Sequence, residues 1–167
     1  DLIKMGFTCP IEVMPILVPF DDYRGRPDEN LSCSLEHVDG TKLLFVGRIA
    51  PNKCQHDVIR AFACYKQIYD RDAHLYLIGS HTDSDAYFAS LLSYVMKLGV
   101  SDVHIQDSIS FQELLAYYRS ADIFLCQSEH EGFCVPLVEA MFFDVPIVAY
   151  DATAVGETMG EGTILLD

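Results

Sequence analysis

The chain has 167 residues, of which 50% are hydrophobic and 22% charged, as expected of one globular domain rather than a disordered chain. Its formal net charge of −14 disfavours nucleic acid and anionic membrane surfaces, because both of these partners are themselves negatively charged. We therefore expect no nucleic-acid partner and no membrane contact through this domain.

Cysteine and histidine usage gives no sign of a disulfide framework or a metal site. The six cysteines form no C-x-x-C pair, and several lie in apolar runs, which predicts reduced, buried thiols of a cytoplasmic protein. The six histidines form no H-x-x-x-H pattern, so no metal is expected, and His56 and His130 are interpreted as ordinary surface or core residues. No signal peptide or membrane-spanning stretch is recognisable.

Residues 1–40 are expected to be an inter-domain linker with an edge segment, because their pattern is irregular. Residues 11–19 could form a short strand, but Pro15 and Pro19 restrict it to an edge or a connector. The stretch from Asp21 to Asp39 is rich in Asp, Arg, Pro, Asn, Ser and Gly, which predicts a surface loop. We interpret this opening as the arrival of the chain from another domain.

Residues 41–167 are predicted to form a single α/β domain. Strands are predicted at 43–46, 74–78, 103–105, 122–126 and 145–149, and a further element begins within 162–166. The segments between them have helical spacing, with N-caps offered by residues 82–85, a capping box at Ser110–Glu113 and a helix stop at Gly99. This alternation predicts a doubly wound, Rossmann-like parallel sheet with helices on both faces.

The loops that follow the predicted strands should meet at one edge of the sheet, where open α/β folds bind their ligands. These loops are Gly47–Lys53, Gly79–Ser80, Asp107–Ser110 and Ser128–Cys134. In the first loop, Gly47 permits close approach of a ligand, and Arg48 and Lys53 supply charges suited to a diphosphate. Read alone, the same residues also fit a solvated turn with two surface cations.

The last of these loops carries Glu131, and Glu139 follows it eight positions later inside a predicted helix over 136–143. Carboxylates at these positions can accept hydrogen bonds from sugar and ribose hydroxyls, although Glu139 also suits the helix dipole alone. The backbone N–H groups of Gly132, Phe133 and Cys134 could bind phosphate or a sugar hydroxyl, although they also fit an ordinary helix start.

An ordered set of motifs carries a family resemblance from about residue 11 to the end of the chain. The set comprises Gly47-Arg48 with Lys53, Ile78-Gly79-Ser80, Tyr118 with Asp122-Ile123-Phe124, Ser128 to Met141 with its two glutamates, and Pro146 to Ala149. In order and spacing this set resembles the C-terminal half of retaining group 1 glycosyltransferases of GT-B architecture.

The resemblance implies a role for each candidate residue. Arg48, Lys53 and Glu131 would be catalytic: the two cations would clamp the diphosphate and stabilise the departing nucleotide, and Glu131 would hold the transferred sugar. Glu139 would bind the ribose hydroxyls. The remaining donor-binding positions implied are Gly47, Gly79, Ile109, Gly132, Phe133, Cys134 and Phe143, with Ile109 and Phe143 flanking the base.

The implied reaction moves a hexose, of mannose or glucose type, from a UDP- or GDP-sugar to a glycan or lipid-linked acceptor, with retention and without a metal. The implied setting is cytoplasmic polysaccharide synthesis, with any contact to the inner face of the membrane made through a different domain. The family's N-terminal acceptor domain and its final C-terminal helices are expected to lie outside this chain. We therefore expect the chain by itself to bind donor weakly and to transfer no sugar.

Three positions depart from the family pattern: Asp144 and Ser80 stand where glycine is frequent, and Cys134 stands where a small residue is common. Asp144 is expected to have little effect, because Asp tolerates a left-handed backbone. Two other functions stay open at this point. One is a nucleotide-sugar epimerase or phosphorylase of the same architecture, and the other is a non-enzymatic, Rossmann-like nucleotide-binding module.

Overall fold

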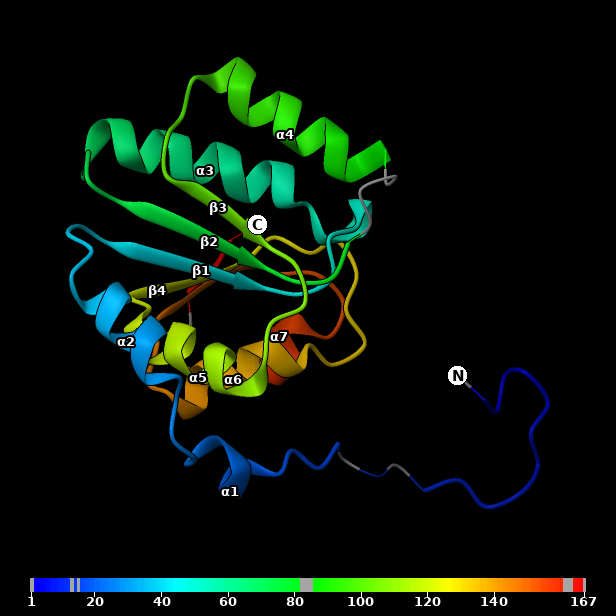
Figure 1. The fold of residues 1–167 in the computed structure, drawn as a ribbon. Coiled ribbons are helices and arrows are strands. Elements are labelled where there is room, and N and C mark those ends of the chain that lie inside the picture. Colours follow the sequence, from blue (N-terminus) through cyan, green and yellow to red (C-terminus); the bar gives the residue numbers. More distant parts are fainter. Residues whose placement is uncertain (1, 13, 15, 82–85, 161–163, 167) are drawn as a thin grey trace.

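The structure is a computed structural model that describes residues 2–12, 14, 16–81, 86–160 and 164–166. The described strands are β1 (Lys42–Val46), β2 (His74–Ile78), β3 (Val103–Gln106), β4 (Ile123–Cys126), β5 (Ile147–Tyr150) and β6 (Ile164–Leu166). They form one parallel sheet in the order β3-β2-β1-β4-β5-β6 (Figure 1). The order reverses between β1 and β4, which is therefore the topological switch point of the sheet.

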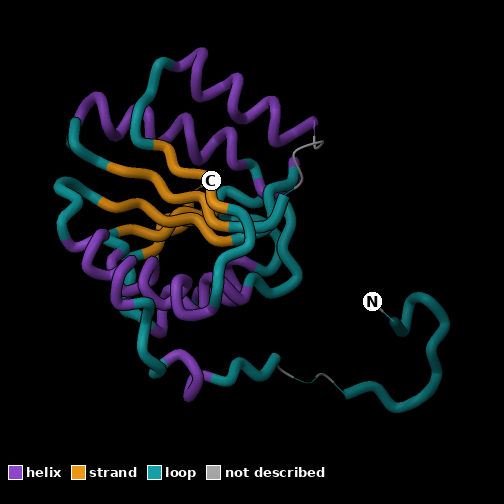
Figure 2. The backbone as a smooth tube through the Cα atoms, viewed as in Figure 1, coloured by secondary structure: helices purple, strands orange, loops and turns teal. Residues whose placement is uncertain are grey.

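Helices cover both faces of this sheet. The helices are α1 (Phe20–Tyr23), α2 (Glu29–Glu36), a 3-10 turn η1 (Pro51–Lys53), α3 (Gln55–Ile68), α4 (Ala86–Leu98), α5 (Phe111–Ser120), α6 (Val135–Phe142) and α7 (Val155–Met159). Helices α3 and α4 lie on one face, and α2, α5, α6 and α7 lie on the other; Figure 2 shows the sheet between these two layers. The predicted doubly wound α/β fold is confirmed.

Strand β1 shows how the sequence builds two cores at once. Leu43 and Phe45 point to the core beneath α3 and α4, whereas Leu44 between them enters the core shared with α5 and α6. Alternation of side chains along a strand produces this division. A strand buried on both faces needs apolar residues at successive positions, and the run of three fully buried side chains in β1 meets that need.

Several local expectations also agree with the structure. Ser110 and Glu113 form the predicted capping box, in which each side chain bonds the backbone N–H of the other. Gly99 follows α4 with φ of 62°, as a helix stop requires. The predicted N-caps at 82–85 lie outside the described residues. The last expected element is β6, and the preceding residues 162–163 are also outside the described part.

The loop predicted from Asp21 to Asp39 is wrong, because this segment contains α1 and α2. Asp28 caps α2 by accepting a hydrogen bond from the N–H of Leu31, 2.7 Å away. Leu35 is 3% exposed and packs into the core with α5. The polar residues that resembled a loop form the solvent side of an amphipathic helix, so the folded domain begins before residue 41.

The short strand considered at residues 11–19 does not occur among the described residues of that range. Ile11, Met14, Ile16 and Leu17 are exposed there, and the segment extends away from the sheet (Figure 1). Its prolines lack backbone N–H groups, so the segment has fewer hydrogen-bond donors with which to pair with the edge of a sheet. Within the described residues, no helix is both long enough and apolar enough to cross a bilayer.

Candidate functional site

The loops at the carboxyl ends of the strands touch one another in the same order as the strands. Each contact joins a loop to that of the neighbouring strand. The contacts are His81 N–H to Asp107 Oδ1 (3.3 Å), Ile49 N–H to the Ser80 carbonyl (3.1 Å), Glu129 N–H to the Asn52 carbonyl (3.0 Å) and Glu131 N–H to Thr153 Oγ1 (2.8 Å). The predicted meeting of these loops at one edge of the sheet is therefore confirmed.

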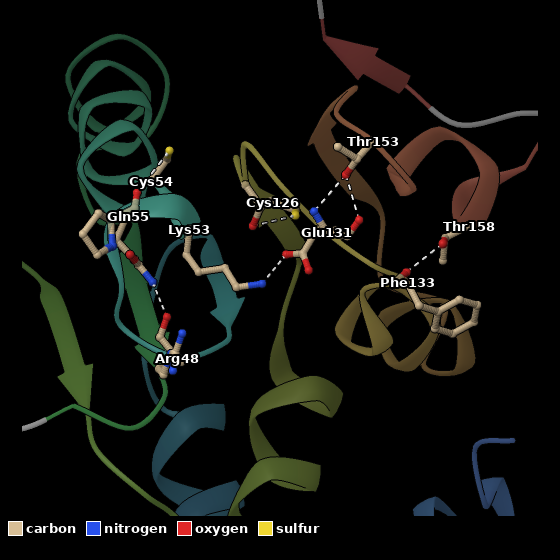
Figure 3. A network of polar contacts seen from close by, with 11 residues as sticks. Arg48, Lys53, Cys54, Gln55, Cys126, Glu131, Phe133, Thr153 and Thr158 are labelled. Carbon is tan, nitrogen blue, oxygen red and sulfur yellow. Dashed lines mark hydrogen bonds and ion pairs between the residues drawn. The ribbon is translucent and has the colours of Figure 1, made fainter. Parts of the chain in front are cut away.

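Lys53 and Glu131 form an ion pair across the switch point (Figure 3). The Lys53 Nζ atom lies 2.5 Å from Glu131 Oε1, although the two residues are 78 positions apart. Only 21% of the Lys53 side chain and 8% of the Glu131 side chain are exposed. A charged hydrogen bond this well shielded is stronger than a surface pair, and it places a cation and an anion side by side at the sheet edge.

Glu131 is also fixed through its backbone. The Thr153 hydroxyl accepts a hydrogen bond from the Glu131 N–H and donates one to the Glu131 carbonyl, both at 2.8 Å. Thr158 at the next helix donates to the carbonyl of Phe133 at 2.7 Å. Sequence reasoning missed both threonines. The available signal was their position after β5, the next strand along the sheet from β4.

The first loop depends on a close backbone contact between two glycines. A Cβ placed on Gly79 would stand 1.9 Å from the carbonyl oxygen of Gly47, so no side chain fits there. The carbonyl of Arg48 accepts a hydrogen bond from the buried Gln55 side chain at 2.9 Å. The Arg48 side chain itself is exposed and makes no hydrogen bond or ion pair with any other described residue.

Helix α6 opens with unoccupied backbone donors. Among the described residues, the N–H groups of Gly132, Phe133 and Cys134 find no hydrogen-bond acceptor. Cys134 is the N-cap in a left-handed conformation with φ of 64°, and its side chain does not cap the helix. Pro136 occupies the first turn, where it removes no needed donor. The free donors and the helix dipole favour an anionic or hydroxyl ligand.

Two buried thiols lie beneath Glu131. The neighbouring Cys134 thiol lowers the pKa of Cys126 below its ordinary value, because it can donate a hydrogen bond to the Cys126 thiolate. The same contact, together with burial, raises the pKa of Cys134 well above its ordinary value. Neither thiol contacts solvent freely, because Cys126 is 2% and Cys134 is 9% exposed. A reactive nucleophile needs access as well as a lowered pKa, so the geometry favours a packing role for this pair.

Glu139 is buried between helices rather than open at the sheet edge. It is 7% exposed, and each of its carboxylate oxygens accepts a hydrogen bond from a different phenol. The Tyr23 hydroxyl donates to Oε1 at 2.5 Å, and the Tyr118 hydroxyl donates to Oε2 at 2.6 Å. Burial first, and then the adjacent carboxylate, raises the pKa of both phenols. The sequence analysis identified Glu139, but it did not predict that Tyr23 and Tyr118 would form hydrogen bonds with it.

The two residues expected to flank a base lie in different places. Ile109 is half-buried in the loop after β3, which belongs to the site edge. Phe143 follows the last turn of α6, and its ring stacks on Tyr118 with centroids 5.4 Å apart. Its ring also lies 6.3 Å, centroid to centroid, from that of Tyr23, so Phe143 packs beside both phenols that bond Glu139. That Ile109 and Phe143 flank a base stays a prediction.

Three groups of side chains among the described residues could supply ligands to a metal. They are Cys54 with His56 and Asp57, His74 with Asp102 and His104, and Cys126 with Glu131 and Cys134. In the second group, Lys66 already donates to Asp102 at 2.9 Å, which disfavours another cation. In the third group, Lys53 holds Glu131 in the same way. At the site itself, Lys53 is therefore the cation that stands beside the Glu131 carboxylate.

A doubly wound parallel sheet whose polar loops converge at the switch point defines a Rossmann-like ligand-binding domain. The comparison with known families makes this class more specific. The chain belongs to the family described as "Glycosyl transferases group 1", whose model matches residues 29–166. The predicted membership of the group 1 glycosyltransferases is thereby confirmed.

The relatives support the same family and its C-terminal half. The chain is 33% identical to a GDP-mannose:cellobiosyl-diphosphopolyprenol alpha-mannosyltransferase from Xanthomonas campestris, over 61% of this chain and 26% of that protein. The C-terminal domain of the group 1 protein LpcC from Francisella tularensis matches with a TM-score of 0.68 and 26% identity, covering 85% of this chain and 76% of that one.

A third similar protein is Anabaena HepE in complex with UDP-glucose, with a TM-score of 0.71 and 22% identity, covering 90% of this chain and 39% of that one. At 22% identity, the similarity to HepE supports a shared fold only. The chain spans between 16% and 33% of the length of four curated relatives that it matches.

Proposed function

We propose that this domain binds the donor of a glycosyltransferase, a nucleoside-diphosphate hexose, and that the intact protein transfers the hexose to a glycan or lipid-linked acceptor. The observation that carries the proposal is the Lys53–Glu131 pair at the switch point, beside the free N–H groups at the start of α6. Cation, anion and backbone donors in one place suit a ligand that contains both phosphates and hydroxyls.

Arg48 and Lys53 have the diphosphate as their proposed ligand. Arg48 lies exposed on the loop after β1 with its guanidinium uncommitted among the described residues, so it is available to a phosphate. Lys53 is held close by Glu131 and would share its ammonium group between that carboxylate and the ligand. Both charges would stabilise the negative charge that develops on the departing nucleotide, and no metal is required for this role.

Glu131 and Glu139 have different proposed partners. Glu131 would accept hydrogen bonds from hydroxyls of the transferred sugar, since its backbone is fixed by Thr153 and its side chain by Lys53. Glu139 would accept from the ribose hydroxyls. The N–H groups of Gly132, Phe133 and Cys134 would donate to phosphate or sugar oxygens. Together these contacts would orient the anomeric carbon toward an acceptor.

The proposed transfer retains the anomeric configuration by attack on the same face that the nucleotide leaves. The acceptor oxygen forms a bond to the anomeric carbon while the bond to the phosphate oxygen breaks, and the departing phosphate takes the acceptor proton. UDP- and GDP-sugars of mannose or glucose type are the proposed donors, by analogy with the mannosyltransferase and the UDP-glucose complex named above. We place the reaction in cytoplasmic polysaccharide synthesis, with the acceptor bound by another domain.

Calorimetry with UDP, GDP and their hexose conjugates tests this proposal on the intact protein. The double variant Arg48→Ala with Lys53→Ala should weaken binding by about tenfold or more, because each charged hydrogen bond is worth about 1.5–3 kcal/mol. Arg71→Ala with Lys97→Ala is the matched control, since both residues are exposed and the same net charge is removed. Absence of nucleotide binding, or equal binding by the two double variants, would overturn the proposal.

A further inference from the structure

The buried carboxylate of Glu139 has an arrangement that a simple helix contact does not need. Its neighbours Leu137 and Ala140 are fully buried, so the carboxylate stands in an apolar part of the domain. Within the described residues, no Lys, Arg or His forms an ion pair with it. Burying a carboxylate without hydrogen-bond partners destabilises the fold, and here hydrogen bonds from two phenols offset the lost hydration.

The two phenols come from separate parts of the chain and act on different oxygens. Tyr23 belongs to α1, 116 positions from Glu139, and Tyr118 belongs to α5, 21 positions away. Because Oε1 and Oε2 are each held, the carboxylate cannot rotate. A carboxylate has about four acceptor positions, so the two phenols leave about two of them unused. Two neighbouring acceptor positions match the paired hydroxyl donors of a ribose.

Packing fixes the phenols themselves. Tyr118 is fully buried and stacks on Phe143. The ring of Tyr23 meets Phe111 edge to face with centroids 5.0 Å apart. Arg119 donates to the carbonyls of Tyr23 at 3.5 Å and of Gly25 at 2.7 Å, which ties the end of α1 to α5. Neither hydroxyl is therefore a mobile surface group that meets Glu139 by chance.

We propose that Tyr23 and Tyr118 are positioning residues that preorganise Glu139 to recognise the ribose hydroxyls of the nucleotide. The inference rests on the proposed function, in which Glu139 contacts the ribose. It extends that function by making α1, a segment expected to be part of a linker, a component of nucleotide selection. Preorganised acceptors favour a ligand that fills both positions over one that lacks a hydroxyl.

The test compares UDP and GDP with their 2′-deoxy counterparts on the intact protein by calorimetry. We expect the ribonucleotide to bind at least about tenfold more tightly than its deoxy form, as for a hydrogen bond to a charged group. In Tyr23→Phe and in Tyr118→Phe this ratio should fall to about threefold or less, because the carboxylate is free to rotate. The ratio does not depend on the fraction of folded protein, so a loss of stability does not obscure it.

Two further variants separate the outcomes. Tyr117→Phe removes a buried phenol that forms no hydrogen bond with Glu139 among the described residues, and it should keep the parent ratio. Glu139→Gln should lose the discrimination; if it keeps the ratio, the ribose role in the proposed function fails. If Glu139→Gln loses the ratio while both tyrosine variants retain it, the positioning inference alone is overturned. If one tyrosine variant retains it, the claim for that tyrosine is overturned.

Discussion

The carbonyl oxygen of Gly47 lies where a side chain on Gly79 would have to begin, with only 1.9 Å between the oxygen and an added Cβ. The loops after β1 and β2 therefore touch backbone to backbone. Gly79→Ala should push the Gly47–Lys53 loop out of place and lower the free energy of unfolding by about 1–3 kcal/mol, as overpacking does. Urea denaturation measures the loss, and nucleotide binding should weaken with it.

Gly132→Ala is the control for that prediction, because an added Cβ on Gly132 would meet nothing within 4 Å. Its midpoint of unfolding should stay near that of the parent. Equal stability of Gly79→Ala and the parent would show that the two loops can separate without cost, contrary to the contact described.

The Lys53–Glu131 pair should show strong thermodynamic coupling. Lys53→Ala leaves a carboxylate that is only 8% exposed without its cation, and Glu131→Gln leaves an unpaired ammonium. Each single variant should therefore lose stability, and the loss of the double variant should be about 1–3 kcal/mol smaller than the sum of the two single losses. A double-mutant cycle by urea denaturation measures the coupling. Additivity within about 0.5 kcal/mol would contradict a direct pair.

His104 should make stability decline toward acidic pH. Burial lowers the pKa of His104, the neighbouring His74 lowers it further, and Asp102 acts in the opposite direction. Because the unfolded chain binds the proton more readily, stability from this residue is complete above the ordinary pKa of about 6.5 and is lost as pH falls toward the lowered value.

The measurement is the urea midpoint at about pH 8 and about pH 5, the range over which histidines titrate. His104→Phe keeps an aromatic ring next to Tyr76 and should reduce the pH dependence. His130→Asn, at an exposed position, should retain the parent dependence. An unchanged slope in His104→Phe would assign the acid sensitivity to other groups.

Asp144 has the left-handed backbone expected of it, with φ of 55° at the turn between α6 and β5. Its side chain is exposed. Asp144→Gly should leave the free energy of unfolding nearly unchanged or slightly higher, since glycine adopts this conformation freely. Asp144→Val should lower it by about 1–2 kcal/mol, because a branched side chain resists it. Comparable thermal unfolding of the two variants would argue against backbone strain at this turn.

Local patterns were enough to predict most of the framework. Strands β1, β2, β4 and β5 lie on apolar runs that the sequence marks clearly, whereas β3 is marked only by its two apolar residues. Parallel order follows from the alternation with helices. The approach of Lys53 to Glu131 was also predictable in outline, since both follow strands whose carboxyl ends share an edge.

What sequence reasoning missed depends on contacts between distant segments. Nothing near Tyr23 indicates that its hydroxyl meets Glu139, because the two are 116 positions apart and α1 is a single turn. Helix α2 was hidden because its exposed face is polar, and only Leu31 and Leu35 mark the buried one.

Thr153 gives the site a division of labour between its two sides. By bonding both the N–H and the carbonyl of Glu131, it joins the loops after β4 and β5 into one stiff corner. The loop after β1 carries Arg48, whose exposed side chain has no such restraint among the described residues. A ligand would therefore contact rigid loops on one side and a flexible arginine side chain on the other. The fixed loops after β4 and β5 would therefore determine which ligand binds. The largest conformational change on binding would be that of the Arg48 side chain.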